Sequence, residues 1–270
     1  MINLYYNTNN EDSKCNWLMD SLLQGWPNSA TGNRQGPVDA PGAFWGFIQN
    51  NHVLIAEHQR LEFDWWFWDM PYWGRWNGLK EALNPDQDFY WRVSRNKIHE
   101  TDILERPRDR FANWNMPVYP WKKTGSEIIV CPSSNTMSQW CTNKNEQEWT
   151  ESTIKELKKH TDRPIRVRYK PRAQGTSGPS VALVPFNEDI KDAWAVVTSV
   201  SMCAVEAISA GIPVFCDPIS FTRPVGQTEL SKIEQPVYGN REPWFNHLAY
   251  CQFTQQEIKS GMAYSILTDQ

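Results

Sequence analysis

The stretch from Ala193 to Asp217, AWAVVTSVSMCAVEAISAGIPVFCD, constrains the fold more than any other part of the chain. It opens with the apolar run 193–197 and closes with the run 212–216, and short apolar runs of this kind are typical of buried strands. Between the runs, apolar residues recur at three-and-four spacing and predict a short helix: Val200, Cys203, Ala204, Ala207, Ile208 and Gly211. The stretch therefore predicts a βαβ unit with parallel strands.

Hydroxyl residues at the start of this helix predict a phosphate site. Thr198, Ser199 and Ser201 can cap the free amides of a helix start, and those amides attract phosphate at the carboxyl edge of the sheet. Glu206 lies about one turn further on, where a carboxylate can accept two ribose hydroxyls. The alternative is that the serines only cap the helix and that Glu206 is a solvated surface residue.

The motif S-x-x-x-x-E-A-x-x-x-G-x-P-V-F resembles the nucleotide-sugar half-site of GT-B glycosyltransferases. Its residues here are Ser201, Glu206, Ala207, Gly211, Pro213, Val214 and Phe215. The resemblance covers roughly the second half of the chain, and it implies serines that face the donor diphosphate and a glutamate that faces the ribose. The wider order of segments, including DMPYWGRW and NREPWFNHLAY, also resembles compact glycosyltransferase-like proteins of phage and prophage origin.

The same resemblance implies the architecture. We expect an α/β protein of the GT-B-like class, in which two Rossmann-like lobes face each other across a cleft. Prolines and Gly125 punctuate the chain from Arg106 onward, which is a linker composition. We therefore expect an acceptor-binding lobe over 1–124, a nucleotide-sugar-binding lobe over 125–242, and a C-terminal helix over 243–270 that packs back on the first lobe.

A row of cations follows one face of a predicted strand at 164–172, PIRVRYKPR. Apolar and basic residues alternate there, so one face is buried and the other carries Arg166, Arg168 and Lys170. The residues alone fit a solvated strand face equally well. In the resembled family the last basic residue of such a strand, in a K-P pair, approaches the donor diphosphate, which implies that role for Lys170 and a secondary one for Arg168.

Asp69 is the predicted catalytic residue. It directly follows the strand-like run 63–68, which would bring it to the carboxyl edge of the first sheet, where ligands bind in open α/β folds. A carboxylate there can act as the general base that takes a proton from an acceptor hydroxyl. Equally, an aspartate after a strand often caps the following turn.

Aromatic and basic residues interleave after Asp69. The predicted acceptor-binding residues are Tyr72, Trp73, Arg75, Trp76, Arg92 and Arg95. Flat rings suit stacking on sugars or on extruded bases while arginines hold phosphates. Core packing explains many of the rings as well, since Trp66 and Trp68 share one face of a strand, with Phe63, Trp65 and Phe67 on the other.

Composition limits the partners and the compartment. The net charge is −4, so a nucleic acid or membrane would have to meet a local basic patch. Six cysteines lack any C-x-x-C pair and the five histidines lack ligand spacing with them, so we expect reduced thiols in the cytoplasm and no zinc. The first residues do not have the pattern of a signal peptide, and no apolar run approaches the roughly 18 residues of a membrane span.

The expected reaction is glycosyl transfer from a nucleotide-diphosphate sugar, with a UDP-sugar as the first choice, and without an obligatory metal or other cofactor. The phage-like resemblance favours a 5-hydroxymethylpyrimidine in double-stranded DNA as acceptor, reached by base extrusion. Two alternatives stay open: a transferase that builds surface polysaccharide, and a nucleotide-sugar-binding protein of the same fold without turnover.

Overall fold

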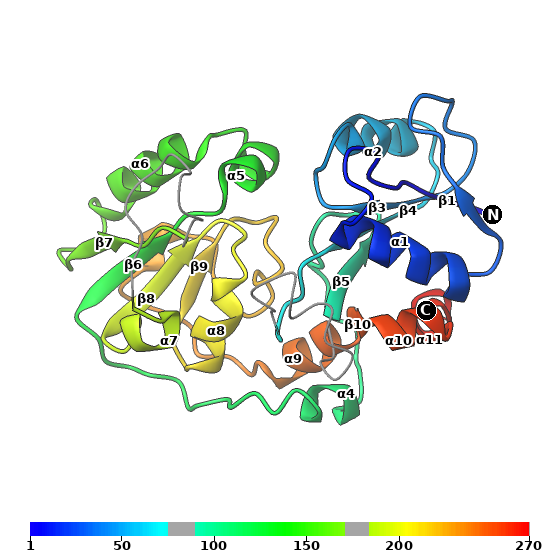
Figure 1. Cartoon of the computed structure of the whole chain (residues 1–270). Helices are drawn as coiled ribbons and strands as arrows, with labels where there is room; N and C mark the ends of the chain where they lie inside the picture. Colours follow the sequence, from blue (N-terminus) through cyan, green and yellow to red (C-terminus); the bar gives the residue numbers. More distant parts are fainter. Residues whose placement is uncertain (75–89, 171–183, 270) are drawn as a thin grey trace. The chain divides into compact units, whose positions relative to one another are not determined.

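The computed structural model describes residues 1–74, 90–170 and 184–269. The chain divides into two compact units. The first contains Met1–Glu100 and His247–Gln270, and the second contains Thr101–Asn246. Each unit has its own sheet with helices on it (Figure 1).

The first unit is built on a sheet of strand order β10-β5-β4-β3-β1-β2 among the described residues. Its strands are β1 (Ile2–Leu4), β2 (Ser29–Thr31), β3 (Gly42–Trp45), β4 (Trp65–Asp69), β5 (Tyr90–Arg95) and β10 (Gln252–Thr254). Its helices are α1 (Lys14–Gly25), α2 (Asn51–Arg60), α10 (Gln255–Lys259) and α11 (Met262–Thr268). The four strands β2, β1, β3 and β4 are parallel, whereas β5 and β10 are antiparallel to their neighbours.

Alternation along β4 divides the core of the first unit into two layers. Trp66 and Trp68 pack against α1, α10 and α11, while Trp65 and Phe67 pack in the layer under α2. This confirms the alternation predicted from the sequence, and it shows that much of the tryptophan content fills the core.

The second unit is a parallel sheet of strand order β7-β6-β8-β9 within the described ranges. Its strands are β6 (Glu127–Cys131), β7 (Ile165–Val167), β8 (Ala193–Thr198) and β9 (Val214–Cys216). Its helices are α4 (Asp109–Ala112), α5 (Asn135–Thr142), α6 (Glu146–Leu157), α7 (Phe186–Asp189), α8 (Cys203–Ser209) and the 3-10 helix η1 (Leu230–Lys232). The chain returns from the second unit to the first between Asn246 and His247, inside the helix α9 (Glu242–Ala249).

The predicted βαβ unit is confirmed as β8, α8 and β9, with β8 and β9 parallel. The buried side chains of Ile128, Val130, Ala195 and Phe215 face α6, whose Trp149 and Leu157 complete this layer of the core. The helices α7 and α8 lie on the other side of the sheet (Figure 1). The sequence prediction of where the helix begins was wrong: α8 starts at Cys203, because Thr198 still belongs to β8 and residues 199–202 form a turn.

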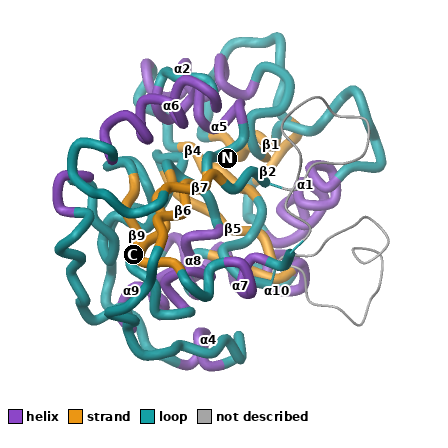
Figure 2. Tube along the Cα trace, turned by 90° about the vertical axis from the view of Figure 1, so that its left-hand side faces the viewer, coloured by secondary structure: helices purple, strands orange, loops and turns teal. Residues whose placement is uncertain are grey.

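The stretch after Glu100 belongs to the second unit, whereas the predicted boundary followed residue 124. This stretch carries α4 and long loops (Figure 2). It is held by Tyr119, whose amide donates to the Ser209 carbonyl over 2.8 Å, and by Lys122, whose amide donates to the Gly211 carbonyl over 2.7 Å. Phe111 of α4 also stacks on Phe245, with ring centroids 4.9 Å apart.

The C-terminal segment 243–270 is not one helix, contrary to the sequence prediction. The strand β10 interrupts it and pairs with β5, and Gly261 separates α10 from α11 with a φ of 83°. The capping box of Thr254 and Glu257 starts α10 directly after the strand. The segment does pack on the first unit, since Ile258, Ala263 and Leu267 join its core. In the described part of the chain, no helix is both long and apolar enough to cross a membrane.

Candidate active site

The carboxyl ends of β6, β8 and β9 bring three loops of the second unit together. Because the strands are parallel, the loops after Cys131, Thr198 and Cys216 start at one edge of the sheet. Ser133 and Ser199 link two of these loops through their hydroxyl oxygens, which lie 2.6 Å apart. The Val200 amide also donates to Ser133 Oγ over 3.1 Å.

Thr198 and Ser199 are buried in this edge. Both are 0% exposed, and Thr198 Oγ1 donates to the Cys131 carbonyl over 2.6 Å. Their hydroxyls therefore hold the loops in place and do not face solvent. Of the three predicted hydroxyl residues, only Ser201 is half-buried, with its Oγ 3.5 Å from the Cys203 amide that donates to it.

Glu206 and Lys170 present charged groups at the surface of the second unit. Glu206 lies one turn inside α8 and is exposed, and Lys170 is exposed three residues beyond the end of β7. These two residues and Ser201 are the predicted donor-binding residues that a ligand can reach in this structure.

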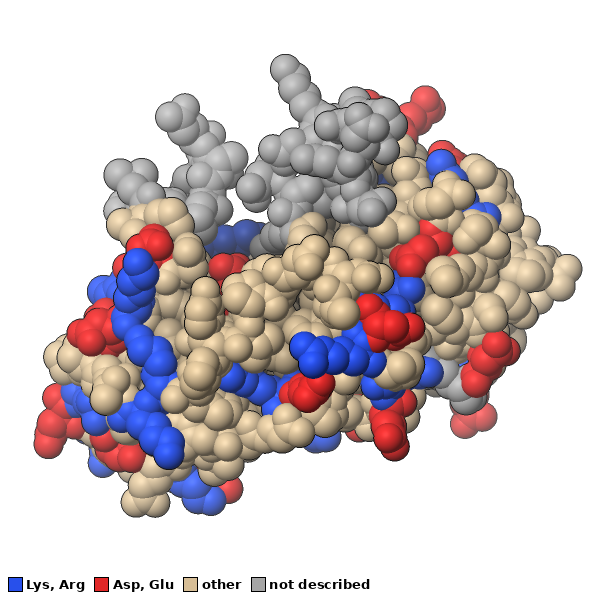
Figure 3. Space-filling view, turned by 90° about the horizontal axis from the view of Figure 1, so that it is seen from below, with Lys and Arg blue, Asp and Glu red and all other residues tan. Residues whose placement is uncertain are grey.

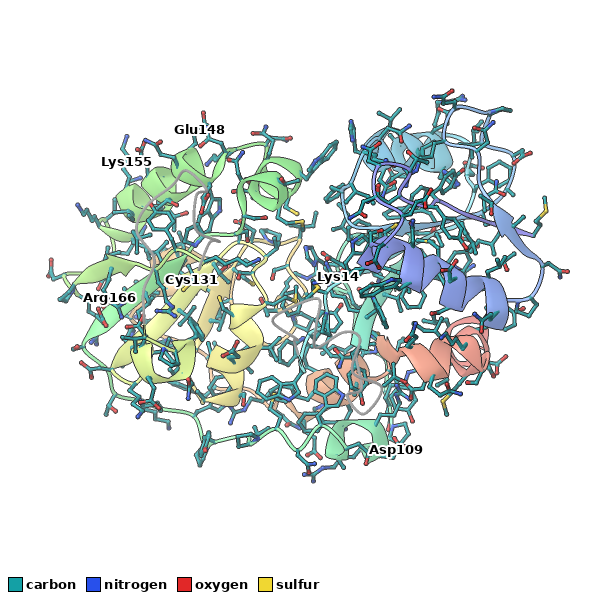
Figure 4. All side chains as sticks on the ribbon, viewed as in Figure 1. Lys14, Asp109, Cys131, Glu148, Lys155 and Arg166 are labelled. Atoms are coloured by element: carbon teal, nitrogen blue, oxygen red, sulfur yellow. The ribbon has the colours of Figure 1, made fainter. Side chains whose placement is uncertain are left out.

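Arg168 is occupied inside the protein. It is buried, it forms an ion pair with Asp189, and its guanidinium donates to the Val184 carbonyl over 2.9 Å. Arg166 on the edge strand β7 (Figure 4) pairs with Glu127 and Asp189. The hydrogen bonds that the Arg166 guanidinium donates to the Glu127 carboxylate raise the pKa of Arg166. Two of the three predicted cations, Arg166 and Arg168, are thus already paired with carboxylates.

Three residues at this edge were not predicted as site residues. Asp217 follows β9 and accepts a hydrogen bond from Trp149 Nε1 over 2.9 Å, and burial raises the pKa of its carboxyl group. Cys131 (Figure 4) at the end of β6 and Cys203 at the start of α8 form a thiol pair. Hydrogen bonding between them raises the pKa of Cys131 and lowers that of Cys203. The sequence signal for Asp217 is its position directly after a strand. The same kind of position led to the prediction of Asp69 as a site residue.

Asp69 is the last residue of β4 and lies opposite Arg92 on β5. Its Oδ2 accepts from Arg92 Nη2 over 2.9 Å, and its Oδ1 accepts from the Met70 amide over 2.7 Å. The Asp69 side chain is 26% exposed, while that of Arg92 is 1% exposed. The carboxylate therefore caps the turn, as in the alternative drawn from the sequence, and also neutralises a buried guanidinium.

The described acceptor-binding candidates do not gather into one exposed surface. Tyr72 is 3% exposed, and burial raises its pKa. Trp73 is half-buried and its amide donates to Gln252 Oε1 over 3.3 Å. Arg95 forms an ion pair with Asp64 over 2.5 Å and lies over the ring of Trp66. Arg75 and Trp76 lie outside the described residues.

A pocket of about 510 Å³, lined mainly by residues that carry an amide or a hydroxyl group, lies at the carboxyl edge of the sheet in the first unit. The loops after β1, β2 and β3 form it, and it is lined by Tyr6, Thr8, Asn9, Thr31, Gly32, Asn33, Arg34, Gln35, Gln49 and Asn50. Arg34 holds these loops together, since its guanidinium donates to the Tyr6 carbonyl over 2.6 Å and to Asn50 Oδ1 over 3.1 Å. Gln49 has a φ of 48°, a left-handed conformation that is uncommon outside glycine. No pattern in the sequence of these three loops predicted the pocket.

A second pocket, of about 570 Å³, lies in the other unit and is lined by Ser126, Lys159, Arg163 and neighbouring residues. Ser126 and Pro164 directly precede β6 and β7, so this pocket lies at the amino edge of the sheet. Ligands of open α/β sheets bind at the opposite edge, and we therefore do not take this pocket as the active site.

One group of side chains in the described residues can hold a metal ion: Glu100, His247 and Cys251, all in the first unit. The sequence predicted no zinc because the histidines lacked ligand spacings with the cysteines, and that prediction overlooked one spacing. The pair His247 and Cys251, four residues apart, is the signal that was available.

Structural comparison identifies the fold. KpsC beta Kdo 2,4 transferase from Thermosulfurimonas dismutans matches 91% of this chain and 89% of its own, with a TM-score of 0.54 and 12% sequence identity. KpsC beta Kdo 2,7 transferase from the same organism matches 97% of this chain and 98% of its own, with a TM-score of 0.48 and 12% identity. No match was found either among protein-family models or among curated protein sequences. The fold is α/β and GT-B-like, as predicted.

Proposed function

We propose that this protein is a glycosyltransferase that transfers a sugar from a nucleotide-sugar donor to a hydroxyl group of a glycan. The GT-B-like fold supports the reaction class. The observation that carries the choice of a glycan acceptor is the set of residues that line the 510 Å³ pocket of the first unit. Apart from Arg34, its lining residues are uncharged, and most of them carry an amide or a hydroxyl group. Such groups donate to and accept from sugar hydroxyls without requiring charge on the ligand.

The donor is proposed to bind at the carboxyl edge of the second sheet. Lys170 would pair with the diphosphate, Ser201 would donate to it, and Glu206 would accept from the ribose hydroxyls. Thr198 and Ser199 contribute indirectly, because their buried hydroxyls hold the loop from which Ser201 projects. A nucleotide-diphosphate sugar fits these roles, and UDP-sugars are the first donors to test.

Asp69 remains our proposed general base. It ends β4 at the same edge of the first sheet as the pocket of the first unit, and its carboxylate is partly exposed. The ion pair with Arg92 fixes the orientation of the carboxylate, which favours proton transfer from a hydroxyl in one position.

A glycan acceptor is better supported than a hydroxymethylated base in DNA. Tyr72 and Arg92 are buried and do not offer phosphate contacts, and the partly exposed Arg95 is already paired with Asp64. On the face drawn in Figure 3, basic and acidic side chains lie beside one another. A DNA duplex is held mainly through contacts of Lys and Arg with its phosphates. The resemblance of the segment order to phage proteins supports a DNA acceptor, and hydroxymethylated DNA is therefore one of the substrates to test.

The test is a transfer assay on the purified chain. Radiolabelled nucleotide sugars, UDP-sugars first, are combined in parallel with bacterial oligosaccharide acceptors and with hydroxymethylated duplex DNA. We expect label on an oligosaccharide. Label on nucleosides after digestion would instead establish the DNA acceptor. Absence of transfer to either class, with nucleotide-sugar binding intact in calorimetry, would favour the non-catalytic binding protein.

Variants then separate the two binding regions. Lys170→Ala and Glu206→Ala are expected to weaken nucleotide-sugar binding by about tenfold each, the effect of losing one charge-assisted hydrogen bond of about 1.4 kcal/mol. Gln49→Ala is expected to raise KM for the acceptor and leave donor affinity unchanged. Asp162→Ala, in the pocket at the amino edge of the second sheet, is the matched control and should change neither. Unchanged donor affinity in both charge variants would exclude the donor assignment.

A further inference from the structure

Three potential metal ligands meet in the first unit, although one of them, Glu100, is distant in the sequence from His247 and Cys251. His247 in the last turn of α9 and Cys251 just after it are brought to Glu100 on the loop that follows β5. The ligand atoms of the three side chains all lie within 4.8 Å of one another. His247 Nε2 is 3.5 Å from Cys251 Sγ and 3.9 Å from Glu100 Oε1.

These distances match the edges of a tetrahedral zinc site. Zinc binds sulfur at about 2.3 Å and imidazole nitrogen at about 2.05 Å, so tetrahedral angles separate the two ligand atoms by about 3.5 Å. The distance of 3.5 Å between His247 Nε2 and Cys251 Sγ therefore requires little movement. The distance of 3.9 Å to Glu100 Oε1 shortens by about half an ångström with a small rotation of the carboxylate.

Charge and burial also suit a divalent cation. A thiolate at Cys251 and the carboxylate of Glu100 would together balance two positive charges, and neutral His247 adds none. The histidine and cysteine are buried, and the Glu100 side chain is 11% exposed, which leaves a route for an ion and a water ligand from that side. Lys97 pairs with Glu100 over 2.5 Å and remains 31% exposed, so it can turn to solvent when a cation binds.

We propose that Glu100, His247 and Cys251 bind a zinc ion, with water as the fourth ligand. The combination of sulfur, nitrogen and oxygen donors selects zinc and cobalt over magnesium and calcium, which take oxygen ligands. This inference does not depend on the proposed transferase activity.

The position of the site in the chain gives it a structural role. Glu100 is the last residue of the first unit before the chain enters the second unit, and His247 is the first residue after the chain returns. A metal bound by both residues ties together the two points at which the chain leaves and re-enters the first unit. Ligand binding to the folded chain stabilises it, so zinc should raise the unfolding temperature of the first unit.

The test uses the full chain after removal of metal with a chelator. Zinc titration is followed by calorimetry, and cobalt serves as the spectroscopic probe. We expect one zinc per chain, a higher unfolding temperature with zinc, and a near-ultraviolet thiolate-to-cobalt charge-transfer band. Magnesium at the same concentration should have no effect. Two results with the unaltered chain would overturn the proposal. One is a cobalt spectrum that lacks the charge-transfer band, and the other is the absence of zinc binding at micromolar concentration.

Two variants identify the ligands. Cys251→Ser and His247→Gln keep the approximate side-chain size. Loss of a residue that only hydrogen-bonds to a metal ligand lowers metal affinity by roughly 10- to 100-fold, and loss of a ligand itself should weaken zinc binding by more than that. Cys251→Ser should also abolish the charge-transfer band. The matched control is Cys141→Ser, at a half-buried cysteine of the second unit, which should keep both the band and the affinity. A band that survives in Cys251→Ser but disappears in Cys141→Ser would assign the metal elsewhere and reject this site.

Discussion

The hydroxyl oxygens of Ser133 and Ser199 lie 2.6 Å apart at the carboxyl edge of the second sheet. Ser133 is 4% exposed and Ser199 is 0% exposed, so water does not compete for this hydrogen bond. The bond joins the loop after β6 to the loop after β8, 66 residues further along the chain. The proposed donor site is therefore built on an internal polar link, and its loops are held before any ligand arrives.

Removal of one of these hydroxyls should destabilise the protein. Ser199→Ala removes the hydroxyl partner of the buried Ser133 Oγ, which still accepts from the Val200 amide, so the loss should cost about 1.5 kcal/mol. Ser201→Ala, in the same loop but half-buried, should cost less than about 1 kcal/mol, because water can replace its hydrogen bonds. Urea unfolding of the two variants provides the comparison. Equal stability of Ser199→Ala and the unaltered chain would show that the bond contributes nothing to holding the loops.

The ion pair of Asp69 and Arg92 gives a prediction in the first unit. Asp69→Asn leaves the buried Arg92 guanidinium without a carboxylate and should cost about 2 kcal/mol, less than for a fully buried pair because Asp69 is 26% exposed. The control is Asp64→Asn. Its partner Arg95 is on the same strand as Arg92 but is 47% exposed, so the loss should be at most about 1 kcal/mol. Equal losses in denaturant unfolding would contradict the structural importance of the buried pair.

Gly211 is required by the backbone conformation and by the space around it. Its φ is 79°, and a Cβ atom there would lie 2.1 Å from the Pro120 carbonyl oxygen. Gly211→Ala combines an unfavourable left-handed conformation with displacement of the 119–122 segment, and should cost roughly 2–5 kcal/mol. The control is Gly239→Ala, where nothing lies within 4 Å of the added Cβ and the expected change is within about 0.5 kcal/mol. A thermal unfolding shift of similar size in both variants would argue against this account.

Local patterns along the sequence predicted much of the fold. The βαβ unit of β8, α8 and β9 follows from its apolar runs and helical spacing, and the alternation in β4 follows from a period of two. The strand β10 was missed because Gln252, Phe253 and Thr254 are only three residues inside a segment whose pattern predicts a helix. Pairing with β5, about 160 residues earlier in the chain, makes them a strand, and a local pattern does not contain that information.

The candidate site was less predictable for the same reason. The sequence marked Thr198 and Ser199 as hydroxyl residues at a helix start that could face a phosphate. Whether a hydroxyl faces a ligand or the interior depends, however, on its partner in the fold. The partners are the Cys131 carbonyl and Ser133, which only the folded sheet brings close. Likewise, the pairing of Asp69 with Arg92 depends on the antiparallel register of β4 and β5. The pocket of the first unit was missed because its loops carry no charged motif.

The buried carboxyl group of Asp217 should make stability depend on pH. Burial raises its pKa above the ordinary value of 3.8, so the folded state binds the proton more tightly than the unfolded state does. The charged form therefore costs stability above the folded pKa, and this cost disappears as the pH falls through the folded pKa to below 3.8. Asp217→Asn keeps an oxygen that accepts from Trp149 Nε1 and removes the charge, so it should raise the unfolding midpoint at pH 7 by an amount that shrinks toward pH 3.5. Asp162→Asn, whose site is unrelated, is the control for a general charge effect, and a stabilisation by Asp217→Asn that grows as the pH falls would refute the assignment.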